Sequence, residues 1–110
     1  MTTSQPEQPS QAPQPEQPTQ PEQPTVRLLL VDDEPGLRSA VQAYLEDEGF
    51  DVTTAVDGED GFAKAQQMLP DVVISDVMMP RLDGYGLLNK LRADERLGGT
   101  PVIFLTAKGM

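Results

Sequence analysis

Three aspartates follow two runs of apolar residues that have the composition of buried strands. Asp32 and Asp33 come directly after the run VRLLLV, and Asp76 follows the run DVVIS, in which the β-branched residues are consecutive. Such runs are typical of strands buried on both faces of a parallel sheet. The carboxyl ends of these strands form the edge where ligands bind in open α/β sheets. If the two strands are neighbours, the three carboxylates meet at this edge.

Clustered carboxylates repel one another unless a cation lies between them. Mg²⁺ is the natural cation, because it takes one or two carboxylates, a carbonyl and retained water, and is often shared with a phosphate. The chemistry that fits is phosphoryl transfer to a carboxylate, with Asp76 as the nucleophile. A carboxylate needs no general base, which suits a chain without His. Thr106, at the end of a later apolar run, is expected to reach the same crevice and to act as a switch hydroxyl.

The rest of the chain indicates strands that alternate with helices. Further strands are predicted over residues 51–56 and 101–106. The predicted helices run from Pro35 to Gly49, from after Gly58 to before Pro70, and from Asp83 to about Arg92. Their expected inward positions are Leu37, Val41, Tyr44 and Leu45, then Phe62, Ala65 and Leu69, then Leu87, Leu88 and Leu91. This βαβαβαβ order predicts a doubly wound α/β fold with a parallel sheet and right-handed crossovers.

Composition divides the chain in two. The first 25 residues hold seven of the 11 prolines, and Gln recurs there at every third position. We expect residues 1–25 to form a disordered, extended Pro/Gln/Glu-rich tail, either solvating or a ligand for a Pro-binding module. The single folded domain is then residues 26–110.

Charge and residue usage exclude several classes of function. The formal net charge of −10 argues against nonspecific binding to nucleic acid or to an anionic membrane. The absence of Cys excludes disulfides, a thiol nucleophile and a Cys-based zinc site. The sequence shows no signal-peptide pattern and no apolar run of membrane-spanning length, so a cytoplasmic protein is expected.

The motifs together resemble the receiver domain of two-component response regulators, over essentially all of residues 26–110. The likeness rests on the acidic pair after a hydrophobic strand, on Asp76 followed by MMP, on the DG that begins at Asp83, and on Thr106 and Ala107 after VIFL. The resemblance implies a flavodoxin/CheY-like fold with the strand order 2-1-3-4-5. It also implies a phosphorelay function in signal transduction rather than a turnover enzyme.

The same resemblance assigns roles to individual residues. Asp76 would be the phosphoacceptor, supplied by a sensor histidine kinase or a phosphotransfer protein. Asp33, Asp76 and the backbone carbonyl of Met78 would hold Mg²⁺, while Asp32 would act through water. Thr106 would be the switch hydroxyl.

The chain departs from the family pattern where it stops at Met110, after the fourth strand. The family's fifth strand, its last two helices and its invariant Lys are absent, and Lys108 does not replace that residue. We expect a strand order of 2-1-3-4, a fragment of a longer response regulator, and no DNA-binding segment. A polypeptide of these 110 residues is expected to be poorly stable, with the strand VIFL as an open edge. A receiver–receiver dimer would need the missing part.

Other readings are open at this point. A phosphatase of the dehalogenase-like type would need a second acid two residues after the nucleophile, where Met78 stands. A truncated receiver that cannot be phosphorylated could serve only as a protein-interaction module. The three acids could be helix caps at strand ends. We expect the side chains of Met78 and Met79 to be packing residues and Tyr85 to be surface or core.

Overall fold

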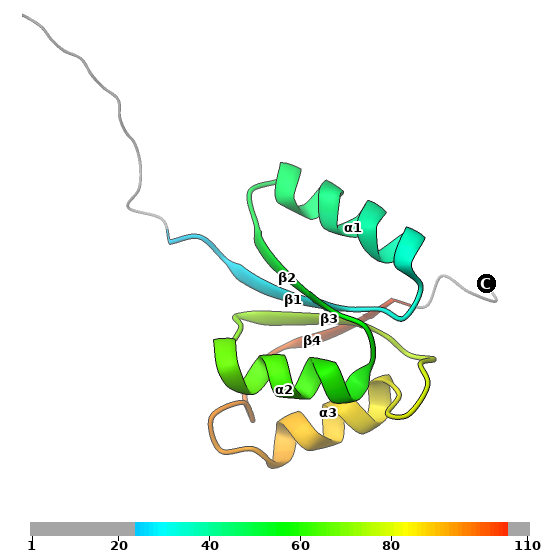
Figure 1. The fold of residues 1–110 in the computed structure, drawn as a ribbon. Helices are drawn as coiled ribbons and strands as arrows, with labels where there is room; N and C mark the ends of the chain where they lie inside the picture. Colours follow the sequence, from blue (N-terminus) through cyan, green and yellow to red (C-terminus); the bar gives the residue numbers. More distant parts are fainter. Residues whose placement is uncertain (1–23, 106–110) are drawn as a thin grey trace, which may run out of the picture.

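The computed structural model describes residues 24–105. In this part of the chain, four strands alternate with three helices (Figure 1). The elements are β1 Arg27–Val31, α1 Pro35–Asp47, β2 Asp51–Ala55, α2 Gly58–Met68, β3 Val72–Asp76, α3 Gly84–Ala93 and β4 Val102–Leu105. All strand pairs are parallel, in the order β2-β1-β3-β4. The predicted α/β class and the predicted strand order are confirmed.

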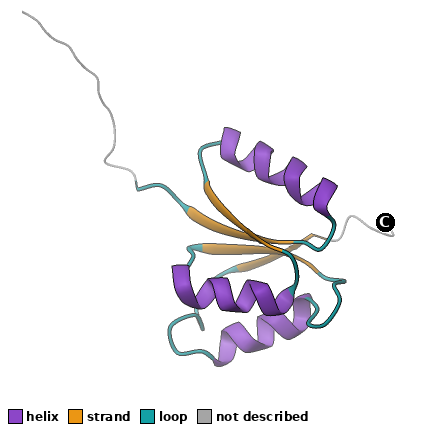
Figure 2. Ribbon diagram, in the orientation of Figure 1, coloured by secondary structure: helices purple, strands orange, loops and turns teal. Residues whose placement is uncertain are grey.

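The sheet is the middle layer of the fold, with α1 on one face and α2 and α3 on the other (Figures 1 and 2). The main core lies between the sheet and the helices α2 and α3, and comprises Leu29, Val31, Ala55, Ala65, Val73, Leu87, Leu91 and Leu97. Leu28 and Leu30 alternate with the core residues of β1 and are also buried. Because side chains alternate between the faces of a strand, β1 is buried on both faces. This burial explains why its apolar run is uninterrupted.

Helix α1 is less buried than its sequence pattern predicts. Leu37 is 36% exposed and Tyr44 is 65% exposed, whereas Val41 and Leu45 are half-buried. No residue of α1 is fully buried. The helix lies over β1 and β2. On the edge strand β4, Ile103 is 52% exposed. The helical period therefore located α1 correctly, but two of its four predicted inward residues, Leu37 and Tyr44, are exposed.

A second correction concerns the end of α2. Leu69 was expected to point inward, but it is the C-cap of α2, with φ of 48° and an exposed side chain. Because its backbone is left-handed, Leu69 does not continue the inward-facing positions of the helix. Met68 packs against the core instead. The other predicted boundaries are correct to within one or two residues, which is the usual uncertainty of helix and strand ends.

Several predictions fall outside the described residues. Thr106 and Lys108 lie beyond them, and so does nearly all of the predicted tail at residues 1–25. Among residues 24–105, no helix has the length and apolar character needed to cross a bilayer.

Candidate functional site

The three aspartates meet at the carboxyl edge of the sheet. Strands β1 and β3 are neighbours with Val31 opposite Ser75, so the next residues, Asp32 just after β1 and Asp76 at the end of β3, lie side by side. One carboxylate oxygen from each of Asp32, Asp33 and Asp76 lies within 4.8 Å of the others. The topology therefore produces a compact cluster of three acids, which we call the acid cluster.

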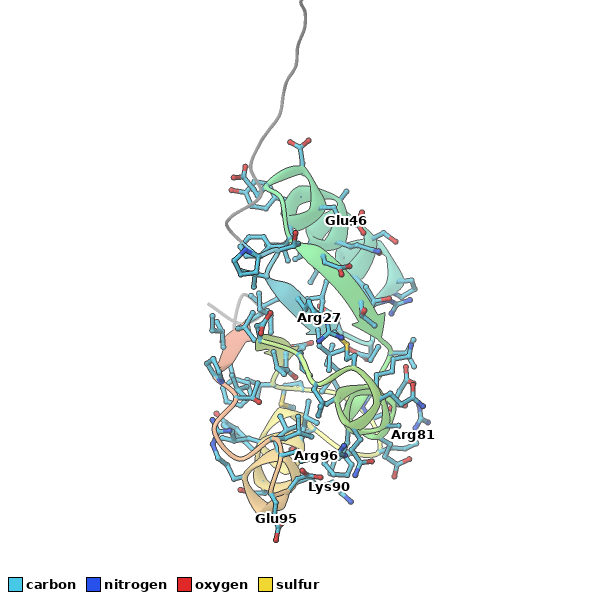
Figure 3. All side chains as sticks on the ribbon, turned by 90° about the vertical axis from the view of Figure 1, so that its left-hand side faces the viewer. Arg27, Glu46, Arg81, Lys90, Glu95 and Arg96 are labelled. Carbon is cyan, nitrogen blue, oxygen red and sulfur yellow. The ribbon has the colours of Figure 1, made fainter. Side chains whose placement is uncertain are left out.

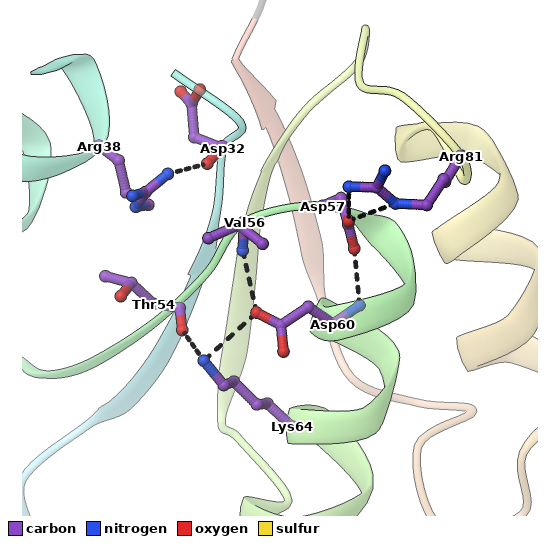
Figure 4. A network of polar contacts seen from close by, with 8 residues as sticks. All are labelled: Asp32, Arg38, Thr54, Val56, Asp57, Asp60, Lys64 and Arg81. Carbon is purple, nitrogen blue, oxygen red and sulfur yellow. Dashed lines mark hydrogen bonds and ion pairs between the residues drawn. The ribbon is translucent and has the colours of Figure 1, made fainter. Parts of the chain in front are cut away.

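The acid cluster is buried on one side and open on the other. Asp32 and Asp76 are 1% and 4% exposed, whereas Asp33 is exposed. Asp32 Oδ1 accepts a hydrogen bond of 2.9 Å from the backbone N–H of Glu34, and its backbone carbonyl accepts one of 2.8 Å from the guanidinium of Arg38 (Figure 4). These bonds fix the turn after β1. A cation can approach the cluster from the side of Asp33.

The loop after Asp76 contains the predicted carbonyl ligand. The Met78 side chain is 68% exposed, while Met79 packs against the core. The expectation that both side chains pack is thus right for Met79 and wrong for Met78. The loop closes with a hydrogen bond of 2.8 Å from the backbone N–H of Gly84 to the Val77 carbonyl. Tyr85 is exposed on α3 and makes an edge contact with Phe104, at 5.2 Å between ring centroids.

Sequence reasoning missed an ion pair beside this loop. The Asp57 carboxylate is the N-cap of α2, since its Oδ1 accepts a hydrogen bond of 2.8 Å from the backbone N–H of Asp60. Its Oδ2 accepts a bond of 2.8 Å from Arg81 Nε and a second, short bond from the terminal guanidinium nitrogen Nη2 (Figure 4). An Asp just before a helix is a recognisable capping signal. Nothing in the sequence marks Arg81 as its partner.

Helix α2 is also tied to the tip of β2. Asp60 Oδ2 accepts a hydrogen bond of 3.1 Å from the backbone N–H of Val56. Lys64 Nζ lies 3.3 Å from the same oxygen and donates a bond of 2.7 Å to the Thr54 carbonyl. Figure 3 shows Arg81 next to α2, whereas Lys90 lies on α3. The N-terminal half of α2 is therefore held to the end of β2 by side-chain contacts.

Asp57 should make stability depend on pH in the acid range. The backbone N–H of Asp60, and next the guanidinium of Arg81, lower the pKa of the Asp57 carboxyl below its ordinary value of 3.8. The unfolded chain then binds the proton more readily, so this stabilisation is present above about pH 4 and is lost as pH falls through the lowered pKa. We expect Asp57→Asn, which keeps a capping oxygen, to cost about 1–2 kcal/mol at pH 7.

Urea unfolding of the parent and of Asp57→Asn across the acid range measures this effect. The difference in free energy of unfolding should shrink as pH falls below about 4. Asp94, whose pKa is also lowered, chiefly by the backbone N–H of Arg96, is present in both proteins. A difference that stays constant down to low pH would contradict the assignment.

Comparison with known proteins identifies the class to which this fold and site belong. The sequence model of the response regulator receiver domain matches residues 28–110. The chain therefore belongs to the receiver domain family of response regulators, the signalling domains of two-component systems, and the resemblance described above is confirmed.

Among the relatives, the response regulator Rre1 of Synechocystis is 55% identical over 86 residues, which are 77% of this chain and 37% of Rre1. The probable transcriptional regulatory protein TcrX of Mycobacterium tuberculosis is 47% identical over 83 residues, covering 76% of this chain and 35% of TcrX. The chain thus spans little more than a third of the length of the curated relatives it matches.

Solved structures show the same fold. The chemotaxis response regulator CheY4 of Vibrio cholerae matches with a TM-score of 0.74 and 37% identity, covering 79% of this chain and 72% of CheY4. The receiver domain of the sensor histidine kinase PA1611 of Pseudomonas aeruginosa matches with a TM-score of 0.74 and 32% identity, over 79% and 71% of the two chains. That structure is described with a magnesium ion coordinated in its active site cleft.

Proposed function

We propose that Asp76 accepts a phosphoryl group in a Mg²⁺-dependent reaction. The observation that carries this proposal is the acid cluster, in which three carboxylate oxygens lie within 4.8 Å at the carboxyl edge of a receiver fold. Asp76 is the last residue of the strand β3, and a carboxylate can attack phosphorus without a general base. It is therefore the nucleophile in this proposal.

The donor set suits Mg²⁺. Opposite ligands of a Mg²⁺ ion are about 4.2 Å apart, twice a metal–oxygen distance of about 2.1 Å. A spread of up to 4.8 Å fits two direct carboxylate ligands and a third that acts through water. We assign Asp33 and Asp76 as direct ligands together with the Met78 carbonyl, and Asp32 as the ligand through water. When bound, the metal would offset negative charge on the transferred group.

In the proposed transfer, a carboxylate oxygen of Asp76 forms a bond to phosphorus while the bond from phosphorus to the donor breaks. The electron pair of that bond leaves with the donor, which is an imidazole nitrogen of a phosphohistidine or the carboxylate of acetyl phosphate. Buried Asp32 adds negative charge beside the reacting atoms, so the cation is needed before a phosphoryl group can approach. Thr106 keeps its predicted role as a switch hydroxyl.

The partners follow from the family and belong to the proposal. The donor is a sensor histidine kinase or a phosphotransfer protein, in the cytoplasm, where ATP is available to the kinase. Residues 26–110 are the receiver domain, with residues 1–25 as its tail, and this part acts as a phosphoacceptor rather than a turnover enzyme. TcrX is named as a probable transcriptional regulatory protein, and transcriptional regulation would require a segment outside the matched region.

Labelling with acetyl phosphate tests the proposal. In the presence of Mg²⁺, the mass of the intact protein should rise by one phosphoryl group, and chelation of the metal should prevent the rise. We expect Asp33→Ala to weaken Mg²⁺ binding at least tenfold and to slow labelling, because Asp76 and a carbonyl would be the only remaining direct protein ligands.

Asp47→Ala is the matched control, since it removes an exposed carboxylate at the opposite end of α1 from the acid cluster. Its Mg²⁺ titration should be the same as that of the parent. If Asp33→Ala bound Mg²⁺ as tightly as the parent, the metal site would be misplaced. A parent that neither takes up phosphate nor binds fluoroberyllate with Mg²⁺ would favour the alternative function, an interaction module that is not phosphorylated.

A further inference from the structure

The loop of residues 77–83 leaves the sheet directly after Asp76 and is attached to the start of α2. The backbone N–H of Gly58 donates a hydrogen bond of 3.1 Å to the Leu82 carbonyl. Beside this bond, the guanidinium of Arg81 reaches the Asp57 carboxylate (Figure 4). Two consecutive loop residues therefore contact the N-cap and the first residue of α2.

Arg81 has an unfavourable backbone conformation for its residue type. Its φ is 67°, in the left-handed region that favours Gly. A residue with a long side chain persists in this region only when surrounding contacts hold it there. For Arg81, the ion pair with Asp57 is such a contact.

The two side chains of this ion pair differ in burial. The Asp57 side chain is 6% exposed, whereas the Arg81 side chain is 58% exposed. The two oxygens of the Asp57 carboxylate also have different partners. Oδ1 accepts a hydrogen bond from the first turn of α2, and Oδ2 accepts one from Arg81. One buried carboxylate thus joins the helix to the loop, while the arginine can be removed without uncapping the helix.

We propose that the ion pair between Asp57 and Arg81, which we call the clamp, positions the loop of residues 77–83 for binding a divalent cation. This inference rests on the function proposed above, in which the Met78 carbonyl is a metal ligand. The Met78 side chain is 68% exposed and does not anchor the loop. The inner half of the loop is held by Met79 in the core, and the outer half by Arg81 and Leu82.

The physical consequence is a change in preorganisation. A carbonyl ligand that is already in place binds the cation without first ordering the loop. Asp57 and Arg81 are therefore positioning residues, which act on the metal through the backbone. Outer contacts of this kind are worth roughly 10–100-fold in metal affinity, and we expect about tenfold here because Met79 holds the other half of the loop.

A double-mutant cycle tests the clamp. Asp57→Asn keeps a capping oxygen but loses the charge, and Arg81→Asn tolerates a left-handed backbone but lacks the guanidinium. Mg²⁺ affinity is measured by chemical-shift titration of the parent, both single variants and the double variant. Each single variant should bind about tenfold more weakly, and the double variant should bind as weakly as either one.

Amide hydrogen exchange gives a second readout that does not depend on the metal. Without Mg²⁺, the amides of Leu82 and Gly84 should exchange faster in Arg81→Asn than in the parent, while amides in the middle of α1 should be unchanged. The matched control is Arg96→Asn, which removes an exposed guanidinium that bonds the Gln66 carbonyl, near the other end of α2. This variant should match the parent in both measurements.

The outcomes separate the clamp from the metal site. If the parent binds Mg²⁺ but Arg81→Asn binds it equally well, the clamp is wrong and the metal site stands. Effects of the two substitutions that add in the double variant would also overturn the clamp, because the residues would then act independently. A parent that binds no Mg²⁺ would overturn the proposed function and the clamp's role in it together.

Discussion

Asp76→Asn should abolish labelling by acetyl phosphate and by a phosphohistidine donor. The neutral amide lacks the charged oxygen that attacks phosphorus, and it also removes one ligand from the proposed metal site. The substitution is nearly isosteric, so a buried side chain at the end of β3 keeps its volume. The expected loss is therefore chemical and not a consequence of unfolding.

The acid cluster provides a check on this interpretation. Without Mg²⁺, three carboxylates within 4.8 Å repel one another, and removing one charge relieves part of that repulsion. Asp76→Asn should accordingly resist urea at least as well as the parent when the metal is absent. The parent alone should gain clearly from Mg²⁺, by about 1.4 kcal/mol when the free metal is ten times its Kd.

Asp47→Asn serves as the control, because it changes an exposed aspartate at the far end of α1. This variant should take up phosphate like the parent. Borohydride reduction of the labelled parent, followed by peptide mass spectrometry, should locate the modified side chain at Asp76. Full labelling of Asp76→Asn would mean that the phosphate resides elsewhere and that the assignment is wrong.

Gly58→Ala should destabilise the domain by about 3 kcal/mol, which for a domain of this size lowers the melting temperature by roughly 12–24 °C. A Cβ atom at position 58 would overlap the carbonyl oxygen of Leu82 and come within 2.8 Å of its carbonyl carbon. These are backbone atoms of the loop after β3, so no side-chain rotation relieves the overlap. The loop or α2 would have to move.

A glycine in the first turn of α1 offers a control, for which the expected change in stability has the opposite sign. Gly36 is the second residue of α1, and a Cβ built there meets no atom within 4 Å. Gly36→Ala should stabilise the domain by about 0.4–1 kcal/mol, because it reduces the freedom of the unfolded chain without a clash. Thermal unfolding followed by circular dichroism measures both variants. If Gly58→Ala unfolded within 0.5 kcal/mol of the parent, the close approach of loop and helix would be contradicted.

The sequence determined the elements and the edge at which the site forms. Alternating strand and helix patterns imply parallel strands, and parallel strands place all their carboxyl ends along one edge. The sequence alone therefore places Asp32, Asp33 and Asp76 at a common edge. The resemblance to receiver domains added the strand order that makes β1 and β3 neighbours, which the structure confirms.

Helical periodicity was a weaker guide to burial. The same spacing marked Leu37 and Leu87 as inward positions, yet Leu37 is 36% exposed and Leu87 is fully buried. The difference arises because α3 packs into the main core with α2, whereas α1 lies alone on its face of the sheet within residues 24–105. A repeat along one helix does not report which neighbours will cover it.

Only the tertiary structure decided how the loop after Asp76 is held. Asp57 and Arg81 are 24 positions apart, and their contact depends on a left-handed residue at position 81 and on a glycine that lets the backbones approach. Local patterns report residue preferences over a few positions, so they can mark an Asp before a helix as a capping residue but not its distant partner. A long-range ion pair is set by the relative placement of two turns, and that placement exists only after the sheet has assembled.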